Sequence, residues 1–265
     1  MKVYEVGGCV RDELMGVQPK DRDWVVVNSS PAEMEQKGFK PIGKDFPVFL
    51  HPKTKEEYAL ARTEKKSGTG YKDFNFYFDN NVTLEEDLRR RDLTINAIAK
   101  DSNGNIVDPY GGKEDIKNKF FRHTSDAFSE DPLRALRLAR FSTYEHLKEF
   151  QVANETVELL NEIVNSGELS SLSADRVWME TFKAISEPGA DKFFETLIEH
   201  NLLEPWFGGL NQVSIDGMRP EYKWAELQRV NKFQICAELP VPNTFKKIIE
   251  LYKLVLKLMS SSSSK

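Results

Sequence analysis

The chain has little cysteine and no long hydrophobic run among its 265 residues. Its two cysteines, Cys9 and Cys236, are too few and too far apart for a disulfide framework or a set of four zinc ligands, as is usual in a reducing cytoplasm. No apolar segment reaches the roughly 18 residues of a membrane helix, and charged residues interrupt the first turns of the chain, where a secretion signal would be apolar. We therefore expect a cytoplasmic protein without a membrane span.

Glycine and proline, at 15 and 12 residues, are too few for a collagen-like or low-complexity chain. Hydrophobic residues make up 40% and charged residues 30%, which is typical of a globular protein and excludes a wholly disordered one. The formal net charge of -5 argues only weakly against nucleic acid as a partner, because the charge is unevenly distributed. Residues 89–140 hold eleven Lys and Arg against eight Asp and Glu, so the basic charge is concentrated there.

The first 122 residues predict a mixed α/β unit. Apolar and β-branched runs predict strands, at residues 2–6, 21–27, 46–51 and 57–62, with a hairpin of 96–99 and 106–107. Helical spacing and capping residues predict helices, at residues 10–14, 31–37 and 84–93. Residues 63–82 contain several glycines and asparagines and fit no regular period, so we expect a mobile loop.

Beyond residue 122 the pattern is helical. Apolar spacing predicts helices, at residues 129–141, 152–164, 173–185, 190–199 and 245–259. The serine run 260–264 is expected to be a disordered tail. The second half of the chain is therefore expected to be all α.

The motif Asp21-Arg22-Asp23 enters a run of three valines. Side chains alternate along a strand, so both aspartates are expected to point the same way, where their charges repel each other unless a cation neutralises them. Mg²⁺ is commonly held by one or two carboxylates together with substrate phosphates, which makes the pair a candidate magnesium site. A solvated turn is the alternative for so short a motif.

Two further segments are candidate phosphate contacts. Gly7 and Gly8 offer backbone N–H groups that no side chain covers, although a plain tight turn would look the same. Arg89–Arg91 are expected at a helix end, where a solvated basic face is one interpretation. The other is a phosphate site, because arginine binds phosphate in a bidentate way and the nearby Asp92 and Asn96, among apolar residues, need partners.

Asp131, Arg134, Arg137 and Arg140 recur every three residues, so a helix would place them along one ridge. A surface salt bridge between Asp131 and Arg134 is the simpler interpretation. A carboxylate beside a guanidinium could also recognise a base edge. Cytosine and adenine present an amine to the carboxylate, whereas uracil and guanine present a carbonyl that it repels. Such a pair would accept C and A and reject U and G.

Several motifs occur together in one order, namely GGCVRD at 7–12, DRD at 21–23, RRDLTINA at 90–97, DPYGG at 108–112 and EDPLR at 130–134. In these motifs and their spacing the chain resembles the class II tRNA nucleotidyltransferase and bacterial poly(A) polymerase family. Within that family it is most similar to the proteobacterial CCA-adding enzymes. The similarity extends to about Trp206 and covers roughly three quarters of the chain.

The resemblance implies an α+β fold. It predicts a nucleotidyltransferase head with a five-stranded, polymerase-β-like mixed sheet, followed by an all-α neck, body and short tail. The expected domains are the catalytic head at 1–122, the neck with the nucleotide-templating helix at 123–146, the helical body at 147–206 and a tail that could contact tRNA at 207–265.

The resemblance also implies the site residues. Asp21 and Asp23 would bind catalytic Mg²⁺, and Glu57 is a weaker candidate for a third carboxylate. The nucleotide-binding residues would be Gly8, Arg11, Arg91, Asp131, Arg134, Arg137 and Arg140, with Gly8 and Arg11 at the triphosphate and Asp131 and Arg134 as the base-templating pair. The expected loop 63–82 falls where the family has a flexible element that helps to switch from C to A addition.

The implied activity is template-independent addition of CCA to the 3′ end of tRNA from CTP and ATP, with release of pyrophosphate. Poly(A) polymerases and enzymes that add only part of CCA share the same head motifs and remain alternatives, as does a catalytically silent RNA-binding protein. The sequence has four histidines and no His-Asp pair, so the metal-dependent HD phosphohydrolase of the longest relatives is not expected.

Overall fold

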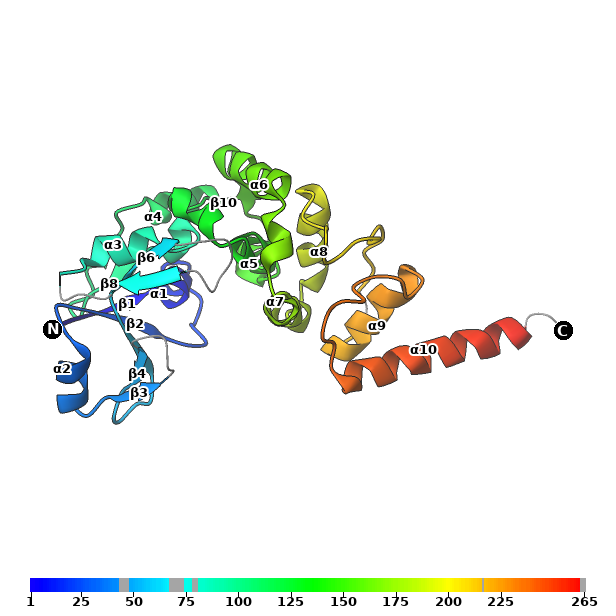
Figure 1. Ribbon diagram of the computed structural model, residues 1–265, viewed down its shortest axis with the longest axis horizontal. Coiled ribbons are helices and arrows are strands. Elements are labelled where there is room, and N and C mark those ends of the chain that lie inside the picture. The colour runs from blue at the N-terminus through cyan, green and yellow to red at the C-terminus, as the bar shows by residue number, and fades with distance from the viewer. Residues whose placement is uncertain (43–47, 67–73, 78–80, 216, 263–265) are drawn as a thin grey trace. The chain divides into compact units, whose positions relative to one another are not determined.

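The computed structural model describes residues 1–42, 48–66, 74–77, 81–215 and 217–262 (Figure 1). The chain divides into two compact units. Unit 1 comprises Met1–Asp131 with Phe150–Glu158, and unit 2 comprises Pro132–Glu149 with Leu159–Lys265. Within the described residues, no helix combines the length and the apolar character that a membrane crossing requires.

Unit 1 is built on a mixed sheet. In the described part of the chain this sheet has seven strands rather than the five expected, in the order β3-β4-β5-β2-β1-β8-β9. The strands are β1 (Lys2–Val6), β2 (Asp23–Val27), β3 (Lys40–Ile42), β4 (Val48–Leu50), β5 (Glu57–Leu60), β8 (Ala99–Lys100) and β9 (Ile106–Val107). Strands β2 and β5 run parallel, and the other neighbours are antiparallel. The mixed sheet confirms the α+β class.

Both faces of the sheet carry apolar side chains. On one face Val6, Val25 and Val27 pack with Leu88 of α3 (Leu84–Arg89). On the other face Val26 packs with Met34 of α2 (Pro31–Gln36). Because side chains alternate along β2, the valine run supplies both cores at once. The sheet is therefore held between two apolar layers.

The short helices of unit 1 are fixed by local capping. The Ser30 hydroxyl accepts from the Glu33 N–H at the start of α2, and Thr83 and Glu86 form a capping box at the start of α3. Helix α3 ends at Arg89, earlier than the expected 84–93, and a 3₁₀ turn at Thr94–Asn96 follows. Unit 1 also contains the helices α1 (Gly8–Leu14) and α4 (Gly112–Asn118).

The expected mobile loop at 63–82 contains regular structure. Strands β6 (Thr63–Lys66) and β7 (Phe74–Tyr77) form an antiparallel pair, so the expectation of an irregular segment is wrong for these residues. Residues 67–73 and 78–80 lie outside the described part.

A second small sheet pairs β10 (Phe120–Phe121) with β11 (Gln151–Val152), which brings the start of α6 (Asn154–Ser166) into unit 1.

Unit 2 is helical, as expected. Its core forms where α5 (Leu133–Phe141) packs on α7 (Ala174–Ser186) and α8 (Ala190–Glu199). Helix α7 also contacts α9 (Pro220–Val230), which packs on α10 (Asn243–Ser262). The rings of Trp178, Trp224 and Phe245 meet edge to face at these contacts. Expected helix 190–199 is confirmed to the residue, whereas the pattern did not predict α9.

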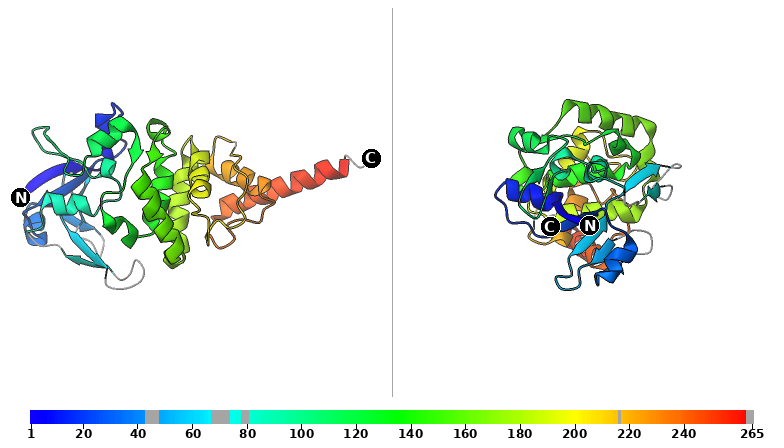
Figure 2. Two further views of the ribbon diagram at one scale, coloured as in Figure 1. Left: turned by 90° about the horizontal axis from the view of Figure 1, so that it is seen from above. Right: turned by 90° about the vertical axis from the view of Figure 1, so that its left-hand side faces the viewer.

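The last helix differs from expectation at its end. Helix α10 continues through Ser262, so the serines 260–262 are helical rather than part of a disordered tail, and residues 263–265 lie outside the described part. Figure 1 shows the second half of α10 extending beyond α9, and Figure 2 shows it from two further sides. Leu251, Leu254 and Leu258 are exposed there.

Candidate active site

Three carboxylates lie at one end of the central strands of unit 1. Asp23 is the first residue of β2 and pairs with Val6, the last residue of β1, and with Glu57, the first residue of β5. Directly paired residues present their side chains on the same face, so Asp23 and Glu57 share a face. Asp21 lies two residues before the strand, and all three carboxylates are exposed.

The start of β2 corrects one expectation. Because the strand begins at Asp23, alternation along a strand does not set the direction of the Asp21 side chain.

The buried thiol of Cys9 lies near Asp23. Burial raises the pKa of this thiol, and the charge of Asp23 raises it further. A hydrogen bond from the Asp23 N–H lowers the pKa, but its effect is smaller than that of burial. Cys9 donates to the Val6 carbonyl at 3.3 Å, so the thiol is a structural group beneath the carboxylates.

The carboxylates fit a hard cation better than a soft one. Oxygen donors from Asp21 and Asp23 are the ligand type that Mg²⁺ prefers. Over the described ranges, no group of three or more His, Cys, Asp or Glu residues gathers closely enough to hold a metal alone. A Mg²⁺ ion held by two carboxylates and by phosphate oxygens of a substrate would match this arrangement. The weaker assignment of Glu57 as a third ligand stays a prediction.

A glycine turn follows β1 at the level of Asp23. Gly7 has φ 82°, a left-handed conformation that favours glycine, and a Cβ there would lie 3.1 Å from Nη1 of Arg91. A Cβ on Gly8 would lie 3.4 Å from Nη2 of Arg11. Two guanidinium groups therefore approach the bare backbone of this turn, beside the exposed Asp23. The Gly7 N–H donates to the Ile98 carbonyl at 3.0 Å, so the turn can offer the Gly8 N–H and arginine charge to an anion.

Arg11 is held in place by two acceptors. The side chain is 3% exposed, and its Nε and Nη2 donate to Oδ1 of Asp12 at 2.8 and 2.7 Å. Its Nη1 donates to Oδ1 of Asn96 at 2.6 Å, and Nδ2 of Asn96 donates to Oδ1 of Asp92 at 3.1 Å. This chain links α1 to the 3₁₀ turn at Thr94–Asn96, so the polar residues around the Arg-Arg-Asp motif have the partners that their burial requires.

Arg91 is anchored by a buried carboxylate that the sequence analysis did not single out. Asp87 is fully buried and accepts from Arg90, from Nη2 of Arg91 at 3.4 Å and from the N–H of Arg62 at 3.2 Å. Burial on its own raises the pKa of Asp87, but the charges of Arg90 and Arg91 outweigh it and hold that pKa below its ordinary value. The i, i+3 and i, i+4 spacing of Asp87 to the two arginines is the signal that could have identified it.

Arg91 also retains an unused donor. Its Nε is buried and has no hydrogen-bond partner among the described residues. Buried N–H donors are almost always paired, so an unpaired one needs an explanation. Nη1 of the same guanidinium lies next to the Gly7 turn, so the unpaired Nε belongs to a group that borders the turn.

The residues of the predicted base-reading pair lie at the division between the units. Asp131 is the last residue of unit 1 in the chain and has an extended backbone, with φ -123° and ψ 101°. Arg134 lies in the first turn of α5 in unit 2 and is 8% exposed. The expected helix 129–141 therefore begins at Leu133, and the predicted ridge of side chains is helical only from Arg134 onward.

The other two predicted arginines lie further along α5. The guanidinium carbon of Arg137 is 5.5 Å from the centroid of the Phe141 ring, and that of Arg140 is 4.6 Å from it. Arg140 is buried and donates from Nε to Oε2 of Glu180 on α7 at 2.5 Å, and it also donates to Tyr144. Its position therefore contributes to the packing of α5 on α7, which the sequence analysis did not predict.

Two family models match the chain. Residues 3–122 match the poly A polymerase head domain. Residues 149–213 match a family described as a probable RNA and SrmB-binding site of polymerase A. The first match covers most of unit 1, including the carboxylates and the glycine turn.

Curated relatives are similar over most of the chain. The multifunctional CCA protein of Acinetobacter baylyi is 54% identical over 222 residues, which are 84% of this chain and 54% of the relative. The protein of the same name from Haemophilus influenzae is 55% identical over 211 residues, or 80% of this chain and 51% of the relative. The chain thus spans about half the length of the curated relatives it matches.

Solved structures share the fold. A tRNA nucleotidyltransferase complexed with a primer tRNA and an incoming ATP analog aligns with a TM-score of 0.76 at 25% identity, covering 100% of this chain and 84% of that one. The Bacillus stearothermophilus CCA-adding enzyme in complex with CTP aligns with a TM-score of 0.71 at 26% identity, covering 98% of this chain and 66% of that one.

Proposed function

Because the chain belongs to the class II tRNA nucleotidyltransferase and bacterial poly(A) polymerase family, we propose that it adds CCA to the 3′ end of tRNA from CTP and ATP, with release of pyrophosphate. One observation carries the proposal, namely the pairing of Val6 with Asp23. It brings the glycine turn, with its two arginines, to the level of the exposed carboxylates. An anion site beside a candidate cation site is what a nucleoside triphosphate with its metal requires.

We propose that Mg²⁺ is held by Asp21 and Asp23, with Glu57 as a weaker third ligand. When bound, the ion supplies charge neutralisation at the triphosphate and lowers the pKa of the attacking 3′-hydroxyl. The chemistry of the donors supports this assignment, since carboxylate oxygens are exposed at the start of β2 and β5. The proposed place of action is the cytoplasm, where tRNA is processed.

The chain's own residues would then position the nucleotide. The Gly8 N–H and the Arg91 guanidinium, whose Nη1 lies next to the turn, would donate to phosphate oxygens. Arg11 contributes charge to the same turn, and Asp12 and Asn96 hold its guanidinium against Gly8. Such a site accelerates transfer mainly by fixing the reactants and neutralising charge, because phosphoryl transfer needs little covalent chemistry from the protein.

Base selection is assigned to Asp131 and Arg134. The Asp131 carboxylate accepts from the exocyclic amine of cytosine or adenine, and Arg134 donates to the neighbouring ring acceptor. Arg137 and Arg140 are proposed to line the nucleotide pocket. Arg140 would do so from a buried position fixed by its pair with Glu180, so we expect its loss to affect helix packing more than nucleotide binding.

The test uses tRNA that lacks its terminal CCA, with Mg²⁺ and each nucleotide supplied separately. CTP alone should add two residues, ATP alone should add none, and both together should restore CCA. A long tail from ATP alone on unrelated RNA would identify a poly(A) polymerase instead. No extension with any nucleotide, together with tRNA binding, would identify a catalytically silent RNA-binding protein.

A further inference from the structure

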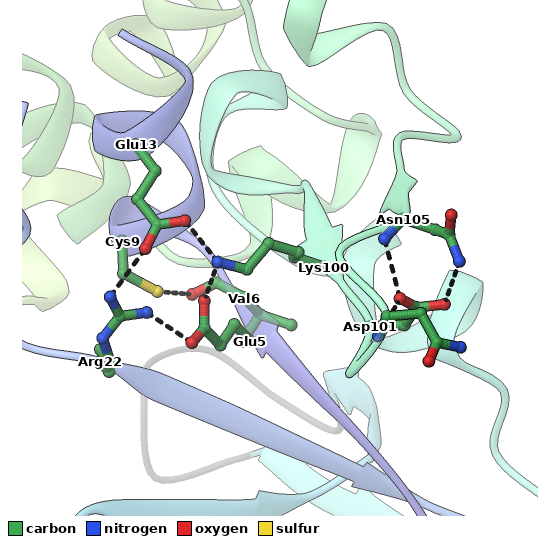
Figure 3. Close-up of polar contacts among 9 residues, drawn as sticks. Glu5, Val6, Cys9, Glu13, Arg22, Lys100, Asp101 and Asn105 are labelled. Atoms are coloured by element: carbon green, nitrogen blue, oxygen red, sulfur yellow. Dashed lines mark hydrogen bonds and ion pairs between the residues drawn. The ribbon is translucent and has the colours of Figure 1, made fainter. Parts of the chain in front are cut away.

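Four charged side chains of unit 1 form a closed ring of ion pairs (Figure 3). Arg22 donates from Nη1 to Oε1 of Glu5 at 2.5 Å and from Nη2 to Oε1 of Glu13 at 2.8 Å. Lys100 closes the ring, with Nζ 2.6 Å from Oε2 of Glu5 and in contact with Oε2 of Glu13. Anions and cations alternate around the ring, so each side chain has two neighbours of opposite charge.

The ring joins separate parts of the candidate site. Arg22 stands between Asp21 and Asp23, and Glu13 lies on α1, which begins at Gly8. Glu5 on β1 and Lys100 on β8 are directly paired across the sheet and provide the fixed side of the ring. The ring therefore connects the segment that carries the carboxylates to the helix that carries the triphosphate-binding end.

The ring lies on the face of the sheet opposite to Asp23. Glu5 pairs with Trp24 and with Lys100, so these side chains share one face, whereas Val6 and Asp23 share the other. Both Nη atoms of Arg22 are committed to Glu5 and Glu13 on that opposite face. Its positive charge is thereby neutralised away from the flanking aspartates, which remain exposed.

The pKa shifts of Lys100 and Glu13 show that the ring favours the charged form of each side chain. Burial lowers the pKa of Lys100, but its hydrogen bonds to Glu13 and Glu5 outweigh burial and raise it. Lys100 and Arg22 in turn lower the pKa of Glu13. The four side chains are between 10% and 32% exposed, so their pairs add little to global stability. Their geometry is restrictive, because a planar guanidinium that spans two carboxylates has few orientations.

We propose that this ring, Glu5–Arg22–Glu13–Lys100, is a positioning device that sets Asp21 and Asp23 relative to the Gly7-Gly8 turn. The inference rests on the proposed function, since it assumes that the aspartates hold a cation and the turn holds a triphosphate. None of the four side chains acts on the substrate directly. Removing one should therefore weaken binding of metal and nucleotide together, as loss of an outer-shell partner commonly does.

The test is a Mn²⁺ titration in the presence of CTP, with free Mn²⁺ followed by its paramagnetic resonance signal. Lys100→Met opens the ring and should weaken Mn²⁺ binding by about tenfold. Arg22→Lys keeps the charge but replaces the planar fork, whose two Nη atoms each bind one carboxylate, with a single ammonium group of less fixed geometry, so it should also weaken binding. Lys100→Arg keeps charge and reach and should restore most of the affinity. Glu13→Gln, which keeps the size of the side chain, serves if Lys100→Met does not fold.

The matched control is Lys117→Met on α4. Lys117 pairs with Glu114 at 3.8 Å on the surface, where the two side chains are 75% and 65% exposed. The Lys117→Met variant should leave Mn²⁺ binding unchanged. Thermal unfolding is measured for every variant. The positioning role is wrong if the ring variants bind Mn²⁺ and CTP like wild type, whether or not their unfolding temperature falls. If wild-type protein binds no Mn²⁺ with CTP, the proposed function itself fails, and the inference fails with it.

Discussion

Arg91 in unit 1 and Arg140 in unit 2 are two arginines with different surroundings. Both were predicted to contact the nucleotide, and each pairs with a buried carboxylate, Asp87 or Glu180. Arg91 meets Asp87 at 3.4 Å through Nη2, its Nη1 lies next to the Gly7 turn, and its Nε has no hydrogen-bond partner among the described residues. Arg140 bonds Glu180 through Nε and Tyr144 through Nη1, and it lies over the Phe141 ring. We therefore expect the remaining donors, more than the ion pair itself, to distinguish an arginine that binds an anion from one that packs helices.

The largest effect is expected from removing the buried carboxylates. Asp87→Ala leaves Arg90 and Arg91 without their shared acceptor and should lower the free energy of unfolding by about 3 to 5 kcal/mol. Glu180→Ala should cost a comparable amount because it leaves the buried Arg140 without its carboxylate. Urea denaturation measures both. A loss below about 1 kcal/mol for either variant would show that its arginine finds water or another partner.

The next effect concerns base choice rather than stability. Asp131→Ala removes the proposed acceptor for the exocyclic amine, so discrimination between CTP and UTP should fall by ~1 to 3 kcal/mol while triphosphate binding changes little. The ratio of kcat/KM for the two nucleotides measures it. Unchanged rejection of UTP and GTP by the variant would disprove the templating role.

The two arginines themselves provide a direct contrast. Arg91→Met should raise the KM for CTP by about tenfold, since it removes a proposed donor to the triphosphate, with a smaller effect on unfolding. Arg140→Met should mainly lower the unfolding temperature, because it leaves Glu180 without its main partner. Steady-state kinetics and thermal unfolding are measured on both. The contrast is wrong if Arg91→Met destabilises the protein while the KM for CTP stays at its wild-type value.

The smallest effect is a pH dependence of the Asp87 cluster. The pKa of Asp87 in the folded protein is below its ordinary value of 3.8, so its contribution to stability is complete above that pH and is lost as the pH falls through the folded pKa. The difference in unfolding free energy between wild type and Asp87→Asn should therefore be constant at neutral pH and shrink in acid. Denaturation curves across that range test it. A difference that instead grows in acid would contradict the ion pair.

These residues also show how far the sequence could predict the structure. Strands β1, β2 and β5 and helix α8 were expected close to their observed positions, because each carries its own apolar or β-branched pattern. Helix α9 was not predicted, because its buried face includes Glu221, Lys223 and Gln228, which obscure the apolar period. Lys223 is accommodated by donating to the Glu187 carbonyl at 2.6 Å, a contact between residues far apart in sequence.

The candidate site was predicted only in part, because local patterns reveal neighbours along the chain but not contacts between distant residues. The motifs identified the carboxylates and the glycine turn, since those residues are neighbours along the chain. Their supporting partners are distant in sequence, as with Arg11 and Asn96 or Arg140 and Glu180, and local spacing cannot reveal them. Asp21 was assigned to a strand because the valine run extends the pattern, whereas pairing with β1 begins only at Asp23.

The most direct measurement compares wild type with Asp23→Ala in the incorporation of labelled CMP into tRNA that lacks CCA. Asp23 lies at an exposed strand end, so the variant should fold like wild type, which circular dichroism checks. The account predicts a loss of about a hundredfold or more, because the proposed cation site loses half of its carboxylates. A folded variant that keeps more than roughly a tenth of wild-type incorporation at saturating Mg²⁺ would contradict the assignment of this strand end as the catalytic centre.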